Sequence, residues 1–469
     1  MFDIIPQLSF FFLIYIFSTK IFFAIQAVDF HWAHTSKKNK KIITLSLLMI
    51  LILLFFSISG IYSNYFFLSI YILYVYSYYK SSFYGLADCY LTPLIMYFIY
   101  RSGDLGLLNS DSSFIFKNTL FPEIFITLLG SLVFFSAGYE KKKSEIWKKG
   151  IAVKLFFYNP KFKKFNFPFI SWEFLFKIFT PVILYSQFLL IFFFVFLPLK
   201  LSIIPLTFIF FFLVMLGIFF HYSDLTLPSL IIVGIMFYTL FKIENTFLIS
   251  YIFEEFSSLV IFEKVILTTF LIIFFSSFLS LIISTKQIEK YQFLKLIKFL
   301  CRYLFGITKV DVYSENHLDN SIAQKFYIIS KSKKKEVFKL YNDDGSPYLL
   351  NTFFLPSAYL AISFRLHDLL SQMDRDKNIN SDHFKLLRGL CQFIIKKNKI
   401  INFPLKIVMY VYQINILDLV QNKNNSEKFA PVLNIDIKSK DDIFVNKIRG
   451  KLLKYNSKRS TKKIRYKFG

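Results

Sequence analysis

A cluster of lysines followed by a tryptophan lies directly after an apolar run of the chain. The cluster consists of Lys141, Lys142 and Lys143, and Trp147 comes one helical turn later. A lysine amine acts as a general base only when it is neutral, so its pKa must fall from about 10.4 towards about 7–8. Desolvation and neighbouring cations both have this effect on an amine. Each of these three lysines is therefore a candidate catalytic base.

Two other interpretations explain the same lysines without any chemistry. Clustered lysines at the end of a span are typical of a cytoplasmic loop in a membrane protein. Lysines beside a tryptophan are also typical of a segment that anchors a protein at the membrane surface. The residue types alone leave all three interpretations open.

The composition is that of a polytopic membrane protein. Hydrophobic residues make up 55% of the chain, and the mean hydropathy is +0.50. Apolar runs recur, and each is close to the roughly 20 residues that cross a bilayer. They predict about nine spans, at residues 8–28, 42–62, 64–80, 84–100, 121–138, 174–198, 202–220, 225–242 and 263–284. Residues 246–262 carry Glu254 and Glu255, which are costly at the bilayer centre, so this segment is predicted to be an interfacial or re-entrant helix.

The charges on the connections predict an orientation in the membrane. Lysines concentrate at residues 37–41, at Lys80, in the loop 139–173 and in the C-terminal region, and all four fall on one side of the predicted bundle. By the positive-inside rule this side is cytoplasmic and the N-terminus lies outside. We therefore expect an integral protein of a bacterial plasma (inner) membrane, with the lipid bilayer as its first partner.

The composition changes after the last span and predicts three regions. They are a transmembrane helical domain over residues 1–285, a basic α+β extramembrane domain over residues 286–445 and a basic disordered tail over residues 446–469. Residue patterns predict strands at 309–313, 325–330, 336–341, 405–417 and 432–437, and helices at 357–373 and 383–399. The predicted fold class is an α-helical polytopic membrane bundle with a small C-terminal α+β domain. The basic tail is suited to anionic lipid headgroups, and no specific nucleic-acid recognition is expected.

The familiar catalytic and metal-binding motifs are absent from the sequence. It contains no GxGxxG, phosphate loop, GxSxG or HExxH. The cysteines Cys89, Cys301 and Cys391 lack CxxC spacing, and His31 and His34 have no third ligand nearby. No metal site is therefore predicted.

Several features together resemble the HTTM (horizontally transferred transmembrane) family, which includes vitamin K-dependent gamma-carboxylase. The lysine cluster is one of them. The others are a span ending in Ser136-Ala137-Gly138, then Trp147 and Gly150, a later pair of spans with His221 near their junction, and the turn at residues 343–347. The resemblance covers most of residues 1–350.

The resemblance implies a membrane enzyme that uses a reduced, vitamin K-like quinone to carboxylate or otherwise modify a peptide substrate. The family's catalytic lysine corresponds to Lys141 when counted from Gly138, and to Lys142 when counted back from Trp147. Trp147 and His221 are the residues implied in binding the cofactor. This chain has Gln187 where the family has a glutamate. The family's C-terminal domain lies on the lumenal side, opposite to the orientation that the charges predict.

Two other functions remain compatible with the sequence. Membrane transporters often have helices that are broken near the binding site, and four prolines are predicted to interrupt spans here: Pro181, Pro198, Pro205 and Pro228. An envelope lipid or polysaccharide transferase would also have many spans. Its large extracytoplasmic loop would be rich in arginine and aspartate, whereas the longest loop between spans here, at residues 139–173, is rich in lysine.

Overall fold

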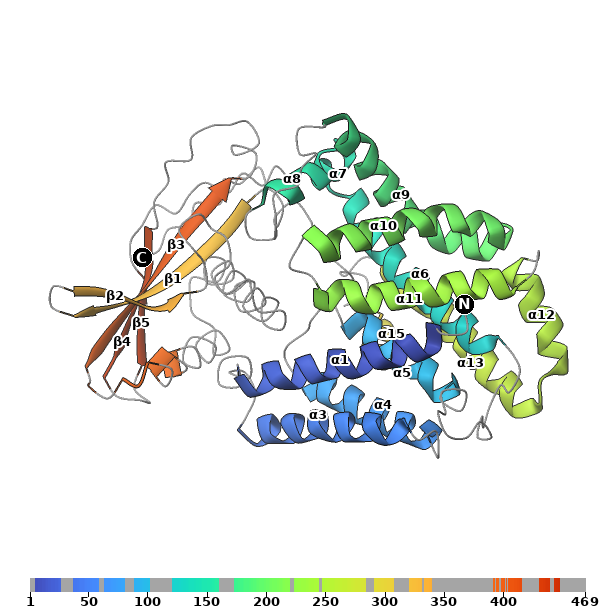
Figure 1. Ribbon diagram of the computed structural model, residues 1–469, viewed down its shortest axis with the longest axis horizontal. Helices are drawn as coiled ribbons and strands as arrows, with labels where there is room; N and C mark the ends of the chain where they lie inside the picture. The colour runs from blue at the N-terminus through green and yellow to red at the C-terminus, as the bar shows by residue number, and fades with distance from the viewer. Residues whose placement is uncertain are drawn as a thin grey trace.

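Helices form most of the described structure, and a small antiparallel sheet lies near the C-terminus. The computed structural model describes residues 5–26, 37–58, 63–80, 88–101, 120–159, 173–219, 223–243, 247–283, 291–307, 320–330, 333–339, 391–392, 394–395, 398–400, 402, 404–415, 430–438 and 443–447. Figure 1 shows the helices and the sheet as two regions of the molecule.

The described helices follow one another along the chain in this order. The first are α1 (Ile5–Gln26), α3 (Lys37–Ser57), α4 (Ser63–Lys80), α5 (Asp88–Arg101) and α6 (Phe121–Lys142). After them come α7 (Glu145–Lys148), α8 (Ala152–Tyr158), α9 (Glu173–Phe196), the 3₁₀ helix η3 (Leu199–Ser202), α10 (Ile203–Phe219), α11 (Ser223–Lys242), α12 (Leu248–Ser258), α13 (Ile261–Ile282) and α15 (Gln292–Phe305). In Figure 1, α1, α3, α10 and α11 run roughly parallel to one another.

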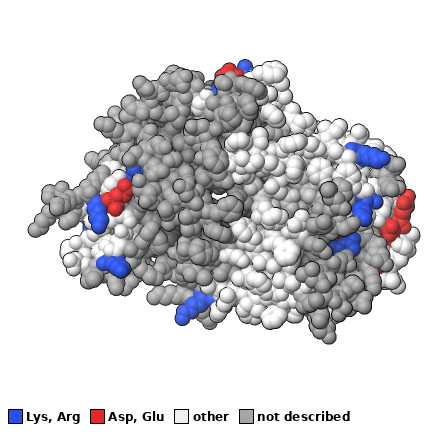
Figure 2. Space-filling model, in the orientation of Figure 1, with Lys and Arg blue, Asp and Glu red and all other residues white. Residues whose placement is uncertain are grey.

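Four of the described helices are long and apolar enough to cross a membrane. They are α6, α9, η3 together with α10, and α13. Shorter apolar helices lie at Leu8–Ser18, Lys41–Ser57 and Thr226–Lys242. Figure 2 shows the described helical region as a broad uncharged surface with charged side chains at its margins. Such a surface suits hydrocarbon, because water would solvate its apolar side chains poorly.

Helix α6 forms the centre of the helical region. It packs against α5, α9, α11 and α13, and nearly all of its side chains are buried. Its close contact with α11 depends on Gly130, where a Cβ would lie 2.5 Å from Ile232 Cγ2 and 2.6 Å from Met236 Cε. Small residues of this kind let membrane helices approach each other closely. Most polar side chains of α6, including Glu123, Thr127, Ser131 and Lys141, are therefore buried inside the protein.

Two of the prolines that were predicted to interrupt spans lie inside continuous helices. Helix α9 passes through Pro181 and α11 passes through Pro228, so the prediction is wrong there. A proline cannot bond the carbonyl four residues earlier, but membrane helices tolerate it when neighbouring groups compensate. Pro205 lies in the first turn of α10, where a proline is favoured. Pro198 does separate α9 from η3, as predicted.

The segment with two adjacent glutamates is helical, as predicted, and corresponds to α12 with the start of α13. Leu248 and Ile252 of α12 are buried, whereas Glu254 is exposed and Glu255 is half-buried. The amphipathic helix thus turns its apolar side inwards and keeps its carboxylates out of the packed interior. Its place at the membrane interface stays a prediction.

Helix α15 was not predicted from the sequence, and it packs with the helices although it lies beyond residue 285. It contacts α4, α5 and α13. The hydroxyl of Tyr71 donates to the carbonyl oxygen of Leu304 at 2.7 Å, and the hydroxyl of Ser277 donates to Cys301 Sγ at 3.0 Å. Helical packing therefore continues past the expected domain boundary to the end of α15.

The sheet has five antiparallel strands in the order β2-β1-β3-β4-β5. They are β1 (Asn320–Ser330), β2 (Lys333–Lys339), β3 (Leu405–Asn415), β4 (Ala430–Ile437) and β5 (Ile443–Lys447). Alternate positions on the central strands are buried, as the period of two along a strand leads one to expect: Phe326, Ile407, Met409, Ile435 and Ile437. Val408 and Lys325 are buried as well, so part of the other face of the sheet is also covered.

Four predicted strands overlap observed ones, with displaced ends. Residues 325–330 lie in β1, 336–341 overlap β2, 405–417 overlap β3 and 432–437 lie in β4. Strand β5 was missed, and its last residues Asn446 and Lys447 pair with β4 although they were assigned to a disordered tail. A segment of five residues is too short to show a clear pattern by itself, and β5 forms by pairing with β4. The predicted elements at 309–313, 343–347 and 357–373 lie outside the described residues, as does most of 383–399.

Candidate functional site

The first of the two candidate lysines is buried inside the helical region. Lys141 lies in the last turn of α6 and is only 3% exposed. Its Nζ donates a hydrogen bond of 2.6 Å to Oε1 of Gln187, which is itself buried in α9. Gln187 is 46 residues away in the sequence. The contact therefore depends on how α6 and α9 cross.

Aromatic rings surround the same amine. The Nζ of Lys141 lies 4.9 Å from the ring centroid of Trp147 and 5.6 Å from that of Phe212. Trp147 is in the short helix α7 and is 1% exposed, and Phe212 is a buried residue of α10. Ring faces attract a nearby ammonium group and also offer a flat surface to a planar ligand. Four helices thus meet at one amine.

The crossing of α6 and α9 depends on Gly138. A Cβ at this position would lie 2.6 Å from the backbone nitrogen of Phe188 and 2.8 Å from its Cα, which is closer than real side chains approach. Phe135, one turn earlier, stacks on the ring of Phe188 with a centroid distance of 5.4 Å. Because Lys141 comes one turn after Gly138, this close approach brings its amine to Gln187. Gly138, which precedes the lysines, therefore allows α6 and α9 to pack closely together.

The neighbouring lysines point elsewhere. Lys142 is exposed, and its Nζ lies 4.5 Å from the ring centroid of Phe188. Lys143 forms an ion pair of 2.7 Å with Glu140 and lies over the ring of Tyr139 at 4.0 Å. Successive helix residues point about 100° apart. Of the two candidate bases, the structure therefore buries Lys141 and leaves Lys142 at the surface.

The described part of the connection from α6 to α9, at residues 143–159, packs against α9. Gly150 has a positive φ of 71°, a conformation that favours glycine, and a Cβ there would lie 3.3 Å from the carbonyl oxygen of Lys177 in α9. The backbone N–H of Val153 donates to Oγ1 of Thr180 at 3.4 Å, and Lys154 pairs with Glu173. These contacts hold α7 and α8 against α9, and so they hold Trp147 over Lys141.

Two of the site residues that were predicted from the sequence lie next to each other, and a third lies outside the described residues. Lys141 and Trp147 are adjacent in space, whereas His221 lies outside the described residues. Within the described part of the chain no group of three metal-ligating side chains occurs. Burial raises the pKa of the Cys391 thiol to about 12, so this thiol stays protonated at neutral pH and is a poor nucleophile.

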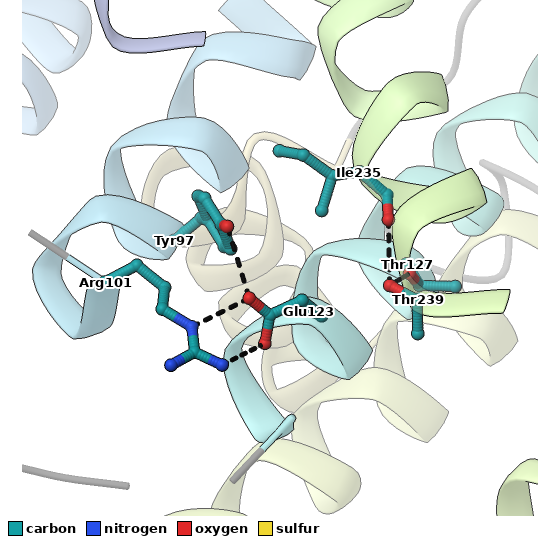
Figure 3. A network of polar contacts seen from close by, with 6 residues as sticks. All are labelled: Tyr97, Arg101, Glu123, Thr127, Ile235 and Thr239. Atoms are coloured by element: carbon teal, nitrogen blue, oxygen red, sulfur yellow. Dashed lines mark hydrogen bonds and ion pairs between the residues drawn. The ribbon is translucent and has the colours of Figure 1, made fainter. Parts of the chain in front are cut away.

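A second polar cluster lies at the other end of α6 and was missed from the sequence. Figure 3 shows Tyr97 and Arg101 of α5 directed at Glu123 in the first turn of α6. Arg101 binds both carboxylate oxygens, with Nε to Oε1 at 2.7 Å and Nη2 to Oε2 at 2.9 Å, and the Tyr97 hydroxyl donates to Oε1 at 3.2 Å. Glu123 is 1% exposed. In the sequence, Arg101 follows the predicted span 84–100, and Glu123 lies at the start of the predicted span 121–138. A cation and an acid at the ends of neighbouring spans were the signal that could have indicated this pair.

The network continues as a pair of threonines on α6 and α11. Oγ1 of Thr127 and Oγ1 of Thr239 are 3.1 Å apart, and Thr239 donates to the carbonyl oxygen of Ile235 at 2.9 Å (Figure 3). Such hydrogen bonds are common between membrane helices, where they contribute about 0.6 kcal/mol on average. They connect α6 to α11 at a position between Glu123 and Lys141.

Comparisons with known proteins return no relatives. No protein-family model, no curated protein sequence and no solved structure matches this chain. The class of protein defined by the structure is therefore a mostly helical one with four helices suited to a membrane and a small antiparallel sheet near the C-terminus.

Proposed function

We propose that this chain is an integral membrane enzyme of the HTTM type with about nine spans, in which Lys141 acts as a base towards a lipid-soluble hydroquinone. The observation that carries the proposal is the position of the Lys141 amine. It is buried, bonded to Gln187 and flanked by the rings of Trp147 and Phe212. A topology signal or a surface anchor needs none of these contacts, because both work with exposed lysines.

The residues around the amine suit a base. Gln187 accepts a hydrogen bond from Nζ at 2.6 Å and so fixes its direction, but it brings no negative charge. A carboxylate in that place would favour the charged amine, which cannot take up a proton. Burial also keeps water from competing with a substrate for the proton. The chain's departure from the family at Gln187 is therefore compatible with a working base.

The same residues fit a quinone in its reduced form. When bound, such a group would supply an acidic ring hydroxyl and two reducing electrons. Trp147 and Phe212 are buried beside the amine, and an aromatic ring bound between them would stack on their flat apolar faces. Lys141 would hold the hydroxyl and take its proton at Nζ. Oxygen chemistry and the modification of a peptide substrate, which the family resemblance implies, extend the same proposal.

Paired variants of the two lysines test this proposal. The full-length chain, purified and reconstituted in liposomes, is given a reduced naphthoquinone, and its oxidation is followed by absorbance. Lys141→Met should slow the reaction by about 100-fold or more, because general bases contribute factors of that order. Lys142→Met, the adjacent exposed position, should leave the rate within about twofold.

Two outcomes would contradict the proposal. An unchanged rate in Lys141→Met would show that Lys141 is not the base. Equal losses of rate in both variants would show that the reaction depends on the total positive charge of the segment. Binding of the oxidised naphthoquinone, followed through quenching of tryptophan fluorescence, separates a loss of catalysis from a loss of the binding site.

The alternative functions receive less support. A transporter with helices broken near its site would have interruptions in the spans, yet α9 and α11 run continuously through Pro181 and Pro228. Solute flux into liposomes above background would favour a transporter instead. An altered glycolipid profile in cells that lack the protein would favour an envelope transferase.

A further inference from the structure

Helix α15 carries three cations at regular spacing directly after the last long apolar helix. Lys295, Lys298 and Arg302 are three and four residues apart, which places them on one stripe of a helix. The remaining residues of α15 are mostly apolar. A basic amphipathic helix of this kind is typical of segments that lie at a membrane surface.

One side of α15 is fixed to the helical region. Cys301 and Phe305 are buried, and the bonds from Ser277 and Tyr71 hold Cys301 and Leu304. The helix ends at Gly306, whose φ of 68° is the left-handed conformation of a helix C-cap. Because its C-terminal half is anchored in this way, α15 has a defined orientation towards the rest of the molecule.

A side of α15 that is turned away from the packed residues exposes large apolar side chains. Phe293 is 70% exposed, Leu296 is 53% exposed and Leu300 is 39% exposed. These residues are also three and four apart, so they form a second stripe on the helix. Three exposed apolar side chains on one stripe are unfavourable in water but favourable among acyl chains.

The cationic stripe lies between the packed side and the apolar side. At about 100° per residue, Lys295, Lys298 and Arg302 fall on one flank, about a quarter turn from Cys301 and about a third of a turn or more from Phe293 and Leu296. Lys295 is exposed, and Lys298 and Arg302 are half-buried. Among the residues that the structure describes, Lys295 and Lys298 form no ion pair.

We propose that α15 is an interfacial helix that binds the phosphate groups of anionic phospholipids through Lys295, Lys298 and Arg302. Phe293 and Leu296 enter the acyl region of the same leaflet, and the packed side holds the helix against α13 and α4. The charge of the stripe selects the lipid class, because each cation near an anionic surface contributes about 1 kcal/mol. This site is separate from Lys141 and does not depend on the proposed reaction.

The test compares bound lipids on the purified full-length chain by native mass spectrometry. The protein in neutral detergent receives equal amounts of phosphatidylglycerol and phosphatidylcholine. We expect the wild type to retain phosphatidylglycerol severalfold more than phosphatidylcholine. The variant Lys295→Gln with Lys298→Gln and Arg302→Gln should lose that preference, and the variant Lys295→Arg with Lys298→Arg should keep it, which shows that charge and not folding is responsible.

A charge-matched control uses the lysines of β2. Lys333→Gln with Lys334→Gln and Lys335→Gln removes the same charge from the sheet and should leave the lipid preference unchanged. An equal loss in this control, or an unchanged preference in the α15 variant, would overturn the proposal. Complete displacement of phosphatidylglycerol by inorganic phosphate would also overturn it, because it would show a site for a free anion.

Discussion

At the scale of single residues, the proposed function depends on the direction in which one lysine points. Lys141 and Lys142 have the same side chain and adjacent positions, but one is buried beside Gln187 and the other is exposed. The helical rotation between them decides this difference, and Gly138 decides how close α9 can come. The amine of Lys141 is therefore positioned by a residue that has no side chain.

Substitution of Gly138 by alanine should disrupt this positioning. Its Cβ would meet the backbone of Phe188 at 2.6 Å, so α6 and α9 must move apart. We expect a loss of about 1–3 kcal/mol in stability, as for other overpacked cores, and a slower naphthoquinone oxidation because the Lys141–Gln187 bond lengthens. Thermal unfolding in detergent and the oxidation assay measure the two effects.

Gly217→Ala in α10 is the matched control for this prediction. A Cβ there would lie 3.4 Å from Oγ1 of Thr226, which is an ordinary contact. This variant should behave like the wild type. Equal melting temperatures for the two alanine variants would contradict the role given to Gly138.

At the scale of elements, α6 is held by polar contacts at both of its ends. Glu123 binds Arg101 and Tyr97 of α5 at its start, and Lys141 binds Gln187 of α9 near its end. The two positions are about 27 Å apart along a helix that rises 1.5 Å per residue. A central helix that is pinned at both ends has little freedom to slide, which keeps the lysine site in register.

The ion pair at the start of α6 should contribute strongly to stability. In Glu123→Ala the guanidinium group of Arg101 loses a carboxylate that binds it through two bonds, and breaking a buried pair in this way costs about 3–5 kcal/mol. The exposed pair of Glu145 and Lys148 offers a control, since Glu145→Ala should cost about 1 kcal/mol or less. Thermal unfolding of both variants gives the comparison, and similar losses would show that the Glu123 pair is not special.

At the scale of the whole molecule, the positions of the cations predict an orientation in the membrane. In Figure 1, α1 ends and α3 begins at the end of the helical region that is nearer to the sheet. The start of α3 and the described strands, which include the lysine-rich β2, therefore lie towards the same end. The positive-inside rule places that end in the cytoplasm, whereas the family resemblance expects the C-terminal domain on the lumenal side.

Reporter fusions decide between these two orientations. Fusions of a fluorescent protein after Asn39 and after Gly469 should both fluoresce, because this reporter folds in the cytoplasm and we expect the short lysine-rich loop to set the orientation. Fusions of alkaline phosphatase at the same positions should be inactive. An active phosphatase at Gly469 would contradict the charge-based orientation and favour the family.

The sequence by itself determined the features that depend on neighbouring residues. Apolar runs predicted α6, α9, α10 and α13, because about 20 apolar residues suffice for a membrane helix. Alternating residues predicted strands within β1, β3 and β4. The cluster from Lys141 to Trp147 was visible as a candidate site, because both residues lie within two turns of one segment.

The tertiary structure decided the contacts between segments that are far apart in the sequence. It buried Lys141 and left Lys142 exposed, brought Gln187 and Phe212 to the amine of Lys141, and joined Arg101 to Glu123. It also showed how α15 packs on α13 and how β5 pairs with β4. Periodicity reports only that a helix or strand has a buried side, whereas the partners of that side depend on contacts between residues far apart in the chain.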